Sequence, residues 1–207
     1  MTEATHHARG YCCGNRCRHC PFEFANVADY PAPVLPTLIR RASPADLPAL
    51  VPLARQTFAA AYIDHQEDVA GNFLPYLQTA FAPEVFAKAL RDDTQAWWVA
   101  ADAEGRPWGY AVLKATPESA HGGAMLQRLY VRRQARGLGL GKALLTEAEA
   151  FAKTRGVGAV WLETYVEAPA LETFYVPNGY THVGTDYWTL GMQRFEVAVM
   201  ARALGDA

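Results

Sequence analysis

The chain has 207 residues, of which 51% are hydrophobic and 12% aromatic, and its formal net charge at pH 7 is −2. This composition supplies a sizeable core, and the near-neutral charge gives no electrostatic reason to expect binding to nucleic acid or to an anionic membrane surface. No apolar run approaches the roughly 18 residues that span a bilayer, and the N-terminus lacks the apolar segment of a secretory signal. We therefore expect a soluble, cytoplasmic protein.

The first 36 residues form an extension that differs in composition from the rest of the chain. They contain all four cysteines, Cys12, Cys13, Cys17 and Cys20. They show no helical or strand periodicity, and the three prolines that follow the cysteines, at 31, 33 and 36, indicate an extended linker. We predict a Cys-rich extension and linker over residues 1–36 and one folded domain over residues 37–207.

The cysteine spacing favours a metal site over a disulfide framework, because clustered cysteines in a chain without a secretory signal more often serve metal or redox chemistry. Cys17 and Cys20 are separated by two residues, which is the spacing of a compact thiolate pair. Cys12 or Cys13, with His19, would complete a tetrahedral set. Zinc is therefore the predicted metal, and its predicted ligands are the four cysteines.

Two other interpretations of this segment stay open. One is a loosely packed tail with free thiols. The other is an iron–sulfur site, because Cys13, Cys17 and Cys20 have radical-SAM spacing, although that chemistry needs a large α/β barrel for which the chain has no room. The run R-G-Y-C-C-G-x-x-C-R-H-C-P also resembles small bacterial cysteine-rich proteins, a resemblance that is confined to this segment and implies no known activity.

In the domain, the predicted elements begin with a strand over residues 37–42. A helix follows, with Ser43 as its N-cap and Pro44 at its first position, and runs to about Tyr62. Residues 63–81 are less regular, and Pro83 opens a second helix. Residues 96–101 and 107–113 then form an antiparallel hairpin.

A strand over residues 124–131 leads through a glycine-rich turn into a helix that ends at Gly156, a favourable C′ residue. The next strand, over residues 159–164, is expected to lie parallel to it through a βαβ crossover. A short helix from Pro169 and two closing strands, over 180–190 and 194–201, complete the order β-α-α-β-β-β-α-β-α-β-β.

The glycine-rich turn at residues 136–141, Arg-Gly-Leu-Gly-Leu-Gly, indicates an anion site. Alternate glycines at a helix start leave backbone N–H groups uncovered, and these groups, with the positive end of the helix dipole, favour a phosphate-type anion. A P-loop would need glycine at Arg136 and Ser or Thr at Ala143, and a dinucleotide fingerprint would need G-x-G-x-x-G. In the preceding strand, alternation predicts two faces. One face carries Leu126, Arg128 and Tyr130, and the other carries Gln127, Leu129 and Val131.

The strand L-x-x-L-Y-V followed by R-x-x-G-x-G resembles the coenzyme A-binding motif of the GCN5-related N-acetyltransferases. The element order is also that of this family, and the resemblance covers residues 38 to 204. It implies an α/β (α+β) fold with a mixed twisted sheet of about seven strands flanked by about four helices. Within the family, the chain is most similar to bacterial small-molecule acetyltransferases of the polyamine type.

The resemblance implies that acetyl-CoA is the cosubstrate. The backbone of Leu129, Tyr130 and Val131 would pair with the pantetheine arm like an additional strand. A bulged strand that splays from the strand at 161–164 would open the gap for this arm. The pyrophosphate would face the turn and the helix start, whose residues are Arg136, Gly137, Leu138, Gly139, Leu140, Gly141 and Lys142.

Acetyl transfer to an amine needs a proton donor for the departing thiolate and a base for the amine. The family has a tyrosine at the position of Tyr175, and a phenol with a pKa near ~10 keeps its proton at pH 7. Tyr175 and Glu163 are therefore the predicted catalytic residues. The base stays open among five residues, namely Glu163, His65, Glu67, Asp68 and His121.

The chain departs from the family pattern at two positions. Many relatives have a glutamate near the position of Gln127, and a glutamine side chain cannot take a proton. The late helix of relatives begins with an asparagine where this chain has Ala168, which can neither cap the helix nor contact the cofactor arm.

We predict an acyl-CoA-dependent N-acetyltransferase that transfers an acetyl group from acetyl-CoA to a primary amine of a small molecule, either polyamine-like or amino-acid-like. The acidic residues 64–68 lie where relatives build the acceptor site and would attract a cationic amine. No nucleic acid or membrane partner is expected, and the protein is expected to be a monomer or a homodimer. The alternative is an acyl-CoA-binding regulatory module with little activity and a metal-bound recruiting tail.

Overall fold

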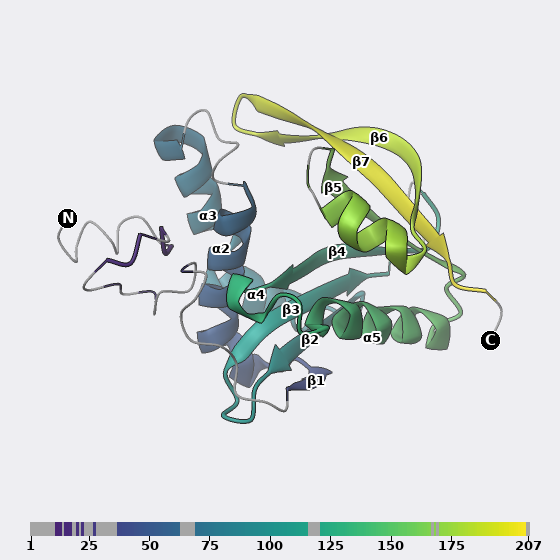
Figure 1. Ribbon diagram of the computed structural model, residues 1–207, viewed down its shortest axis with the longest axis horizontal. Coiled ribbons are helices and arrows are strands. Elements are labelled where there is room, and N and C mark those ends of the chain that lie inside the picture. Colours follow the sequence, from purple (N-terminus) through teal and green to yellow (C-terminus); the bar gives the residue numbers. More distant parts are fainter. Residues whose placement is uncertain are drawn as a thin grey trace.

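One seven-stranded sheet organises the chain, with its strands in the order β1-β2-β3-β4-β5-β7-β6 (Figure 1). The computed structural model describes residues 11–13, 15–17, 20, 22, 27, 37–62, 69–115, 121–166, 168 and 170–205. The strands are β1 (Leu38–Arg41), β2 (Gln95–Ala101), β3 (Pro107–Lys114), β4 (Ala124–Val131), β5 (Ala159–Tyr165), β6 (Thr181–Leu190) and β7 (Gln193–Ala203). Neighbouring strands are antiparallel except for β4 and β5, which are parallel as predicted.

The described helices flank this sheet. The α-helices are α2 (Leu47–Tyr62), α3 (Leu74–Ala80), α4 (Pro83–Ala89) and α5 (Leu140–Thr154). Shorter helical turns are η1 (Pro44–Asp46), η3 (Val69–Phe73), η4 (Arg133–Ala135), η5 (Leu171–Tyr175) and η6 (Val176–Asn178). The predicted mixed α/β fold is therefore confirmed. No helix in the described part of the chain is long and apolar enough to cross a membrane.

Helix α3 is the element that the sequence did not predict. It has only seven residues, a length that is insufficient to stabilise a helix on its own. Packing supplies the rest: Leu77 is buried, and the ring centroid of Tyr76 lies 5.5 Å from those of both Phe58 and Trp188. Tertiary contacts therefore fix a helix whose local pattern is too short to recognise.

Two hydrophobic cores lie on opposite faces of the sheet, and the side chains of β2 and β3 are divided between them. Trp108 is an extra residue in β3, since Ala100 pairs with Gly109 and Ala101 with Pro107, so Trp108 and Tyr110 face opposite sides. Trp98 and Trp108 pack with Leu144 and the rest of the buried face of α5, in what we call the α5 core. Trp97 and Tyr110 pack with the buried faces of α2, α3 and α4, in what we call the α2 core. Figure 1 shows α5 and these three helices in separate parts of the molecule.

Helix α5 has the boundaries that its sequence predicts. Gly139 precedes it in the left-handed region with a φ of 79°, and Gly156 follows it with a φ of 70°. Its buried side chains recur at helical spacing, as expected for one face turned to the sheet. They are Leu140, Leu144, Leu145, Ala148 and Ala152.

Strand β4 contains one extra residue relative to its neighbour. In the pairing with β3, Leu113 lies opposite Leu126 and Val112 lies opposite Arg128, so Gln127 is left over. Such a β-bulge bends the strand and moves every later side chain to the other face.

The bulge overturns the predicted faces of β4. Leu126 packs in the α5 core together with Leu129 and Val131, whereas Arg128 and Tyr130 face the α2 core. The prediction that Leu126 shares a face with Arg128 and Tyr130 was wrong, because strict alternation fails where a bulge inserts a residue.

Among the described residues of the N-terminal segment, Tyr11 and Val27 contact the folded body. Tyr11 is buried within the α2 core, and the carbonyl oxygen of Val27 accepts a hydrogen bond of 2.8 Å from Gln134 Nε2 in η4. The division into residues 1–36 and 37–207 stays a prediction. These contacts place part of the segment beside the turn that precedes α5.

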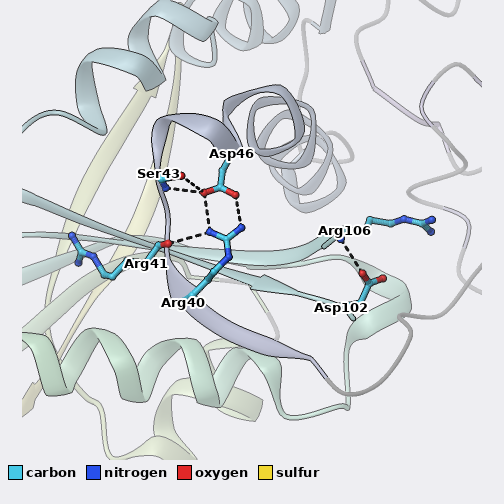
Figure 2. Close-up of polar contacts among 6 residues, drawn as sticks. All are labelled: Arg40, Arg41, Ser43, Asp46, Asp102 and Arg106. Carbon is cyan, nitrogen blue, oxygen red and sulfur yellow. Dashed lines mark hydrogen bonds and ion pairs between the residues drawn. The ribbon is translucent and has the colours of Figure 1, made fainter. Parts of the chain in front are cut away.

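Asp46 fixes the start of the first helical segment to strand β1 (Figure 2). Its Oδ1 accepts a hydrogen bond of 2.6 Å from Arg40 Nη2, and its Oδ2 accepts bonds from Arg40 Nη1 at 2.9 Å and from the Ser43 backbone N–H at 2.7 Å. The hydrogen bonds from Arg40 are the main reason that the pKa of Asp46 falls to about 2 from its ordinary 3.8. The predicted start of the helix at Ser43 and Pro44 is confirmed.

Asp102 closes the turn between β2 and β3 from a buried position. Its Oδ2 accepts a hydrogen bond of 2.7 Å from Trp108 Nε1. Its Oδ1 accepts one of 2.8 Å from the Arg106 backbone N–H, the contact drawn in Figure 2. The hairpin that the sequence predicted is therefore held by a carboxylate as well as by its strand pairs.

Replacing Asp46 by Asn should lower the free energy of unfolding by about 1 kcal/mol at pH 7, because the ion pair with Arg40 is lost from a partly exposed site. The wild-type carboxylate stabilises the fold fully above its unfolded pKa of 3.8 and progressively less as the pH falls toward its folded pKa of about 2. Urea unfolding at neutral and at acid pH should therefore show the two proteins converging as the pH falls.

Glu104→Gln is the matched control, since it removes an exposed contact of 3.5 Å with Arg106 and should change the free energy of unfolding by less than about 0.3 kcal/mol. A difference between Asp46→Asn and wild type that stays constant in acid would contradict the ion-pair explanation.

Candidate active site

The turn before α5 exposes its backbone. Gly137 and Gly139 both adopt left-handed φ values, 81° and 79°, which glycine tolerates better than any other residue. A Cβ atom at either position would meet nothing within 4 Å. The two glycines are therefore required by backbone conformation, and residues 136–139 before α5 are exposed. The backbone N–H groups at this helix start are available to an anion.

Cationic side chains accumulate at this helix start. Arg136 and Lys142 are exposed, and the first turn of α5 contains no acidic residue. Burial of part of its side chain and the nearby Arg133 lower the pKa of Arg136. Positive charges near the positive end of a helix dipole are unfavourable unless an anion compensates them. The arrangement fits a group with several negative charges.

Gly141 links the turn to the late helical segment. A Cβ atom on Gly141 would lie 3.2 Å from Cε2 of Phe174, which is tighter than an ordinary van der Waals contact. The ring of Phe174 in turn packs edge-on against Tyr175, with 5.2 Å between the ring centroids. The first turn of α5 therefore helps to position the predicted proton donor.

Strands β4 and β5 separate after a short paired stretch. They pair at Ala124 with Val160 and at Met125 with Trp161, and no later pair joins them in the described part of the chain. Residues 129–131 of β4 therefore pair with β3 on one edge, while the edge toward β5 has no partner strand. On β4, the Val131 carbonyl oxygen accepts a hydrogen bond of 3.4 Å from Arg136 Nε. The predicted splay of the two strands and the bulge in β4 are both present. An extended arm with amide groups fits this opening.

Three tyrosines from different elements gather near the opening. The hydroxyls of Tyr62 in α2 and Tyr130 in β4 share a hydrogen bond, and Tyr62 lies close enough to Tyr175 in η5 to influence its ionisation. Burial is the main cause that raises the pKa of each phenol above its ordinary value. All three therefore keep their protons near neutral pH, and Tyr175 can donate a hydrogen bond.

Glu163 lies on β5, two residues beyond the last residue that pairs with β4. If the register continued, Glu163 would lie opposite Gln127. Its side chain is half-buried, and burial, followed by the charge of Asp186, raises its pKa, while His121 acts in the opposite direction. A carboxyl with a raised pKa at this place suits a base near neutral pH.

The structure describes one of the other four candidate bases, and it also describes Ala168. His121 lies near Glu163, with its ring 4.7 Å from that of Trp161. His65, Glu67 and Asp68 lie outside the described residues. Ala168 lies in a turn where its N–H donates a hydrogen bond of 2.9 Å to the carbonyl oxygen of Tyr165.

The four cysteines are all described, and none forms a disulfide. Cys13 Sγ lies 3.7 Å from Cys17 Sγ. Cys12 is buried against Val27. Within the described ranges, no group of three or more His, Cys, Asp or Glu side chains is arranged to hold a metal ion. The zinc prediction for Cys12, Cys13, Cys17 and Cys20 therefore has no support from their arrangement, and His19 lies outside the described residues.

Sequence reasoning missed the aromatic wall of the site. Trp188, near the end of β6, packs against Tyr62 in α2 with 5.9 Å between the ring centroids, and against Phe58 at the same separation. Because these residues lie more than a hundred positions apart, no local pattern connects them. Arg128 also faces this region, where its guanidinium lies over Phe81. Strict alternation had placed Arg128 on the same face of the strand as Leu126.

The match to the acetyltransferase (GNAT) family covers residues 58–180, which include the glycine turn and Tyr175. A second match, to a family of unknown function (DUF5522), covers residues 1–26 and contains the cysteine cluster. The chain belongs to the GNAT family, and it is an acyl-CoA-dependent N-acetyltransferase.

Solved structures show the same fold at low sequence identity. The PaiA N-acetyltransferase from Thermoplasma acidophilum, solved with coenzyme A, is 22% identical with a TM-score of 0.68; the match covers 82% of this chain and 99% of that one. A GCN5-related N-acetyltransferase from Rhodopseudomonas palustris is 20% identical with a TM-score of 0.64, covering 84% and 96%. The ribosomal-protein-S18-alanine N-acetyltransferase from Escherichia coli is 20% identical with a TM-score of 0.57, covering 83% and 96%.

Proposed function

We propose that the protein transfers an acetyl group from acetyl-CoA to a primary amine of a small molecule, with the chemistry at the split between β4 and β5. The observation that supports this most strongly is the continuity of three features. The edge of β4 without a partner strand at residues 129–131 precedes the cationic glycine turn. On this strand, Tyr130 interacts with Tyr62, which in turn interacts with the phenol of Tyr175. One extended ligand with a charged end and a reactive end fits such a path.

The two ends of acetyl-CoA suit the two ends of this path. The pyrophosphate would accept hydrogen bonds from the N–H groups of residues 137–142, with Arg136 and Lys142 supplying opposite charge. The pantetheine arm would pair with the backbone of Leu129, Tyr130 and Val131, which has no partner strand on that edge. The bound thioester supplies an activated acetyl carbonyl carbon.

The residues at the reactive end would move protons. As the amine nitrogen bonds to the carbonyl carbon and the C–S bond breaks, the amine must lose a proton and the sulfur must gain stabilisation. Glu163, directly or through a water, would take the proton from the amine. Tyr175 would donate a hydrogen bond to the sulfur, and its raised pKa keeps that donor proton in place.

In this proposal, a carboxylate on the neighbouring strand β5 takes the place of the carboxylate that β4 lacks. Gln127 cannot act as a base, but Glu163 lies on β5 two residues beyond the last pair with β4, where the two strands separate. A proton acceptor on either strand would face the same opening. The substitution at Gln127 is therefore compatible with catalysis in this proposal.

Tyr175→Phe should lower kcat by about 100-fold while changing the KM for acetyl-CoA by less than about threefold, because the lost hydroxyl acts on the leaving sulfur and not on cofactor binding. Initial rates with a panel of small amines measure both constants. Tyr180→Phe is the matched control: its ring packs edge-on against Tyr175, with 5.8 Å between the ring centroids, but its hydroxyl bonds to Glu149 at 3.0 Å.

An unchanged kcat in Tyr175→Phe would remove Tyr175 from the mechanism. Tight coenzyme A binding by the wild type, without transfer to any amine, would instead favour the acyl-CoA-binding regulatory module.

Glu163→Gln should lower kcat/KM by about 100-fold, because the base is lost. On the acid side, the slope of log(kcat/KM) against pH should also fall by one, because the base must be deprotonated to act. Asp186→Asn is the informative companion. The charge of Asp186 raises the pKa of Glu163, so its removal should move this limb to lower pH and leave the plateau unchanged. A Glu163→Gln profile with the wild-type shape would exclude Glu163 as the base.

A further inference from the structure

Arg128 is a buried cation that the proposed mechanism does not use. Its guanidinium lies over the rings of Phe81, at 4.3 Å from the centroid, and Phe86, at 5.5 Å. Its Nη1 atom is buried and has no hydrogen-bond partner. In the described part of the chain, no carboxylate forms an ion pair with Arg128, unlike Arg40 and Arg202, which each have one.

A second polar group accompanies Arg128. The buried hydroxyl of Tyr110 on β3 lies beside Arg128 and Thr57, but it makes no hydrogen bond of good geometry with either. Tyr130 and Tyr76 also interact electrostatically with the guanidinium. Two polar groups from neighbouring strands therefore face one aromatic region, and Arg128 Nη1 still lacks an acceptor.

An unpaired buried guanidinium is energetically unfavourable. The faces of Phe81 and Phe86 offset part of the desolvation of the charge through cation–π attraction, but the N–H donors on Nη1 still lack an acceptor. A leucine or methionine would fill the same space without this penalty. Arginine is favoured over apolar residues where a carboxylate or phosphate is bound in a bidentate manner.

Arg128 is close to the proposed reactive end. It lies on the same face of β4 as Tyr130, two residues or about 7 Å along the strand, and Tyr130 shares its hydrogen bond with Tyr62, the neighbour of Tyr175. It also follows directly after the bulge at Gln127.

We propose that Arg128 binds a carboxylate of the acceptor, so that the acceptor is an amino-acid-like amine and not a polyamine. This inference rests on the proposed function. A polyamine would bring further positive charge against an unpaired guanidinium, whereas an amino acid would supply the two acceptor oxygens that the fork requires. The aromatic wall of Phe58, Tyr76 and Trp188 then contacts the apolar part of the acceptor.

Matched amine pairs that differ by one carboxylate test the proposal: lysine against cadaverine, ornithine against putrescine, and tyrosine against tyramine. The wild type should acetylate the carboxylate member of at least one pair with a kcat/KM about tenfold or more above its partner. Arg128→Met should lower kcat/KM for that member by about 100-fold and change it for the decarboxylated partner by less than about threefold. Arg128→Lys keeps the charge without the fork and should recover part of the loss.

Two further measurements separate this inference from the function on which it rests. Calorimetry with coenzyme A should give the same affinity for wild type and Arg128→Met, and melting curves should show that the variants are folded. Preference for the decarboxylated members, or an equal loss for both members in Arg128→Met, would overturn the carboxylate assignment while leaving acetyl transfer intact. Failure of the wild type to acetylate any member would overturn both.

Discussion

The single extra residue in β4 is the constraint on which the rest of the site depends. The bulge at Gln127 turns Arg128 and Tyr130 toward the α2 core and leaves Leu129 and Val131 in the α5 core. A regular strand would place the opposite residues at these positions. β4 also separates from β5 at this level of the sheet, so the opening, the exposed backbone edge and the side chains around it share one local cause.

The anion site is built from backbone conformation rather than from a charged pocket. Left-handed glycines expose the N–H groups at the start of α5, and nearby cations add charge without a compensating acid in the first turn. Gly141 packs closely against Phe174, and Phe174 packs against Tyr175, so this site is in direct contact with the segment that carries Tyr175. In the proposed enzyme, the group that binds the charged end of the cofactor and the group that assists the leaving sulfur are thus parts of one packed unit.

Much of the fold follows from local sequence, and the site follows from it only in part. The cap at Ser43, the C′ residue Gly156 and the glycine turn each encode a boundary through backbone chemistry, so these were predictable. The family resemblance implied a bulged strand, but the position of the bulge was not predictable, because nothing in the alternation near Gln127 marks an inserted residue. The proximity of Tyr62 to Trp188, and the isolation of Arg128 from any acid in the described residues, are products of tertiary packing that no short pattern records.

The most direct test of the central claim compares the binding of coenzyme A and of pantetheine to the wild-type protein by isothermal titration calorimetry. Both ligands carry the arm that would pair with β4, and only coenzyme A carries the pyrophosphate that would face the start of α5. The account predicts that coenzyme A binds about 100-fold more tightly or better, because pantetheine lacks the charge-assisted hydrogen bonds at the glycine turn. Equal affinities, or no binding of coenzyme A, would contradict it.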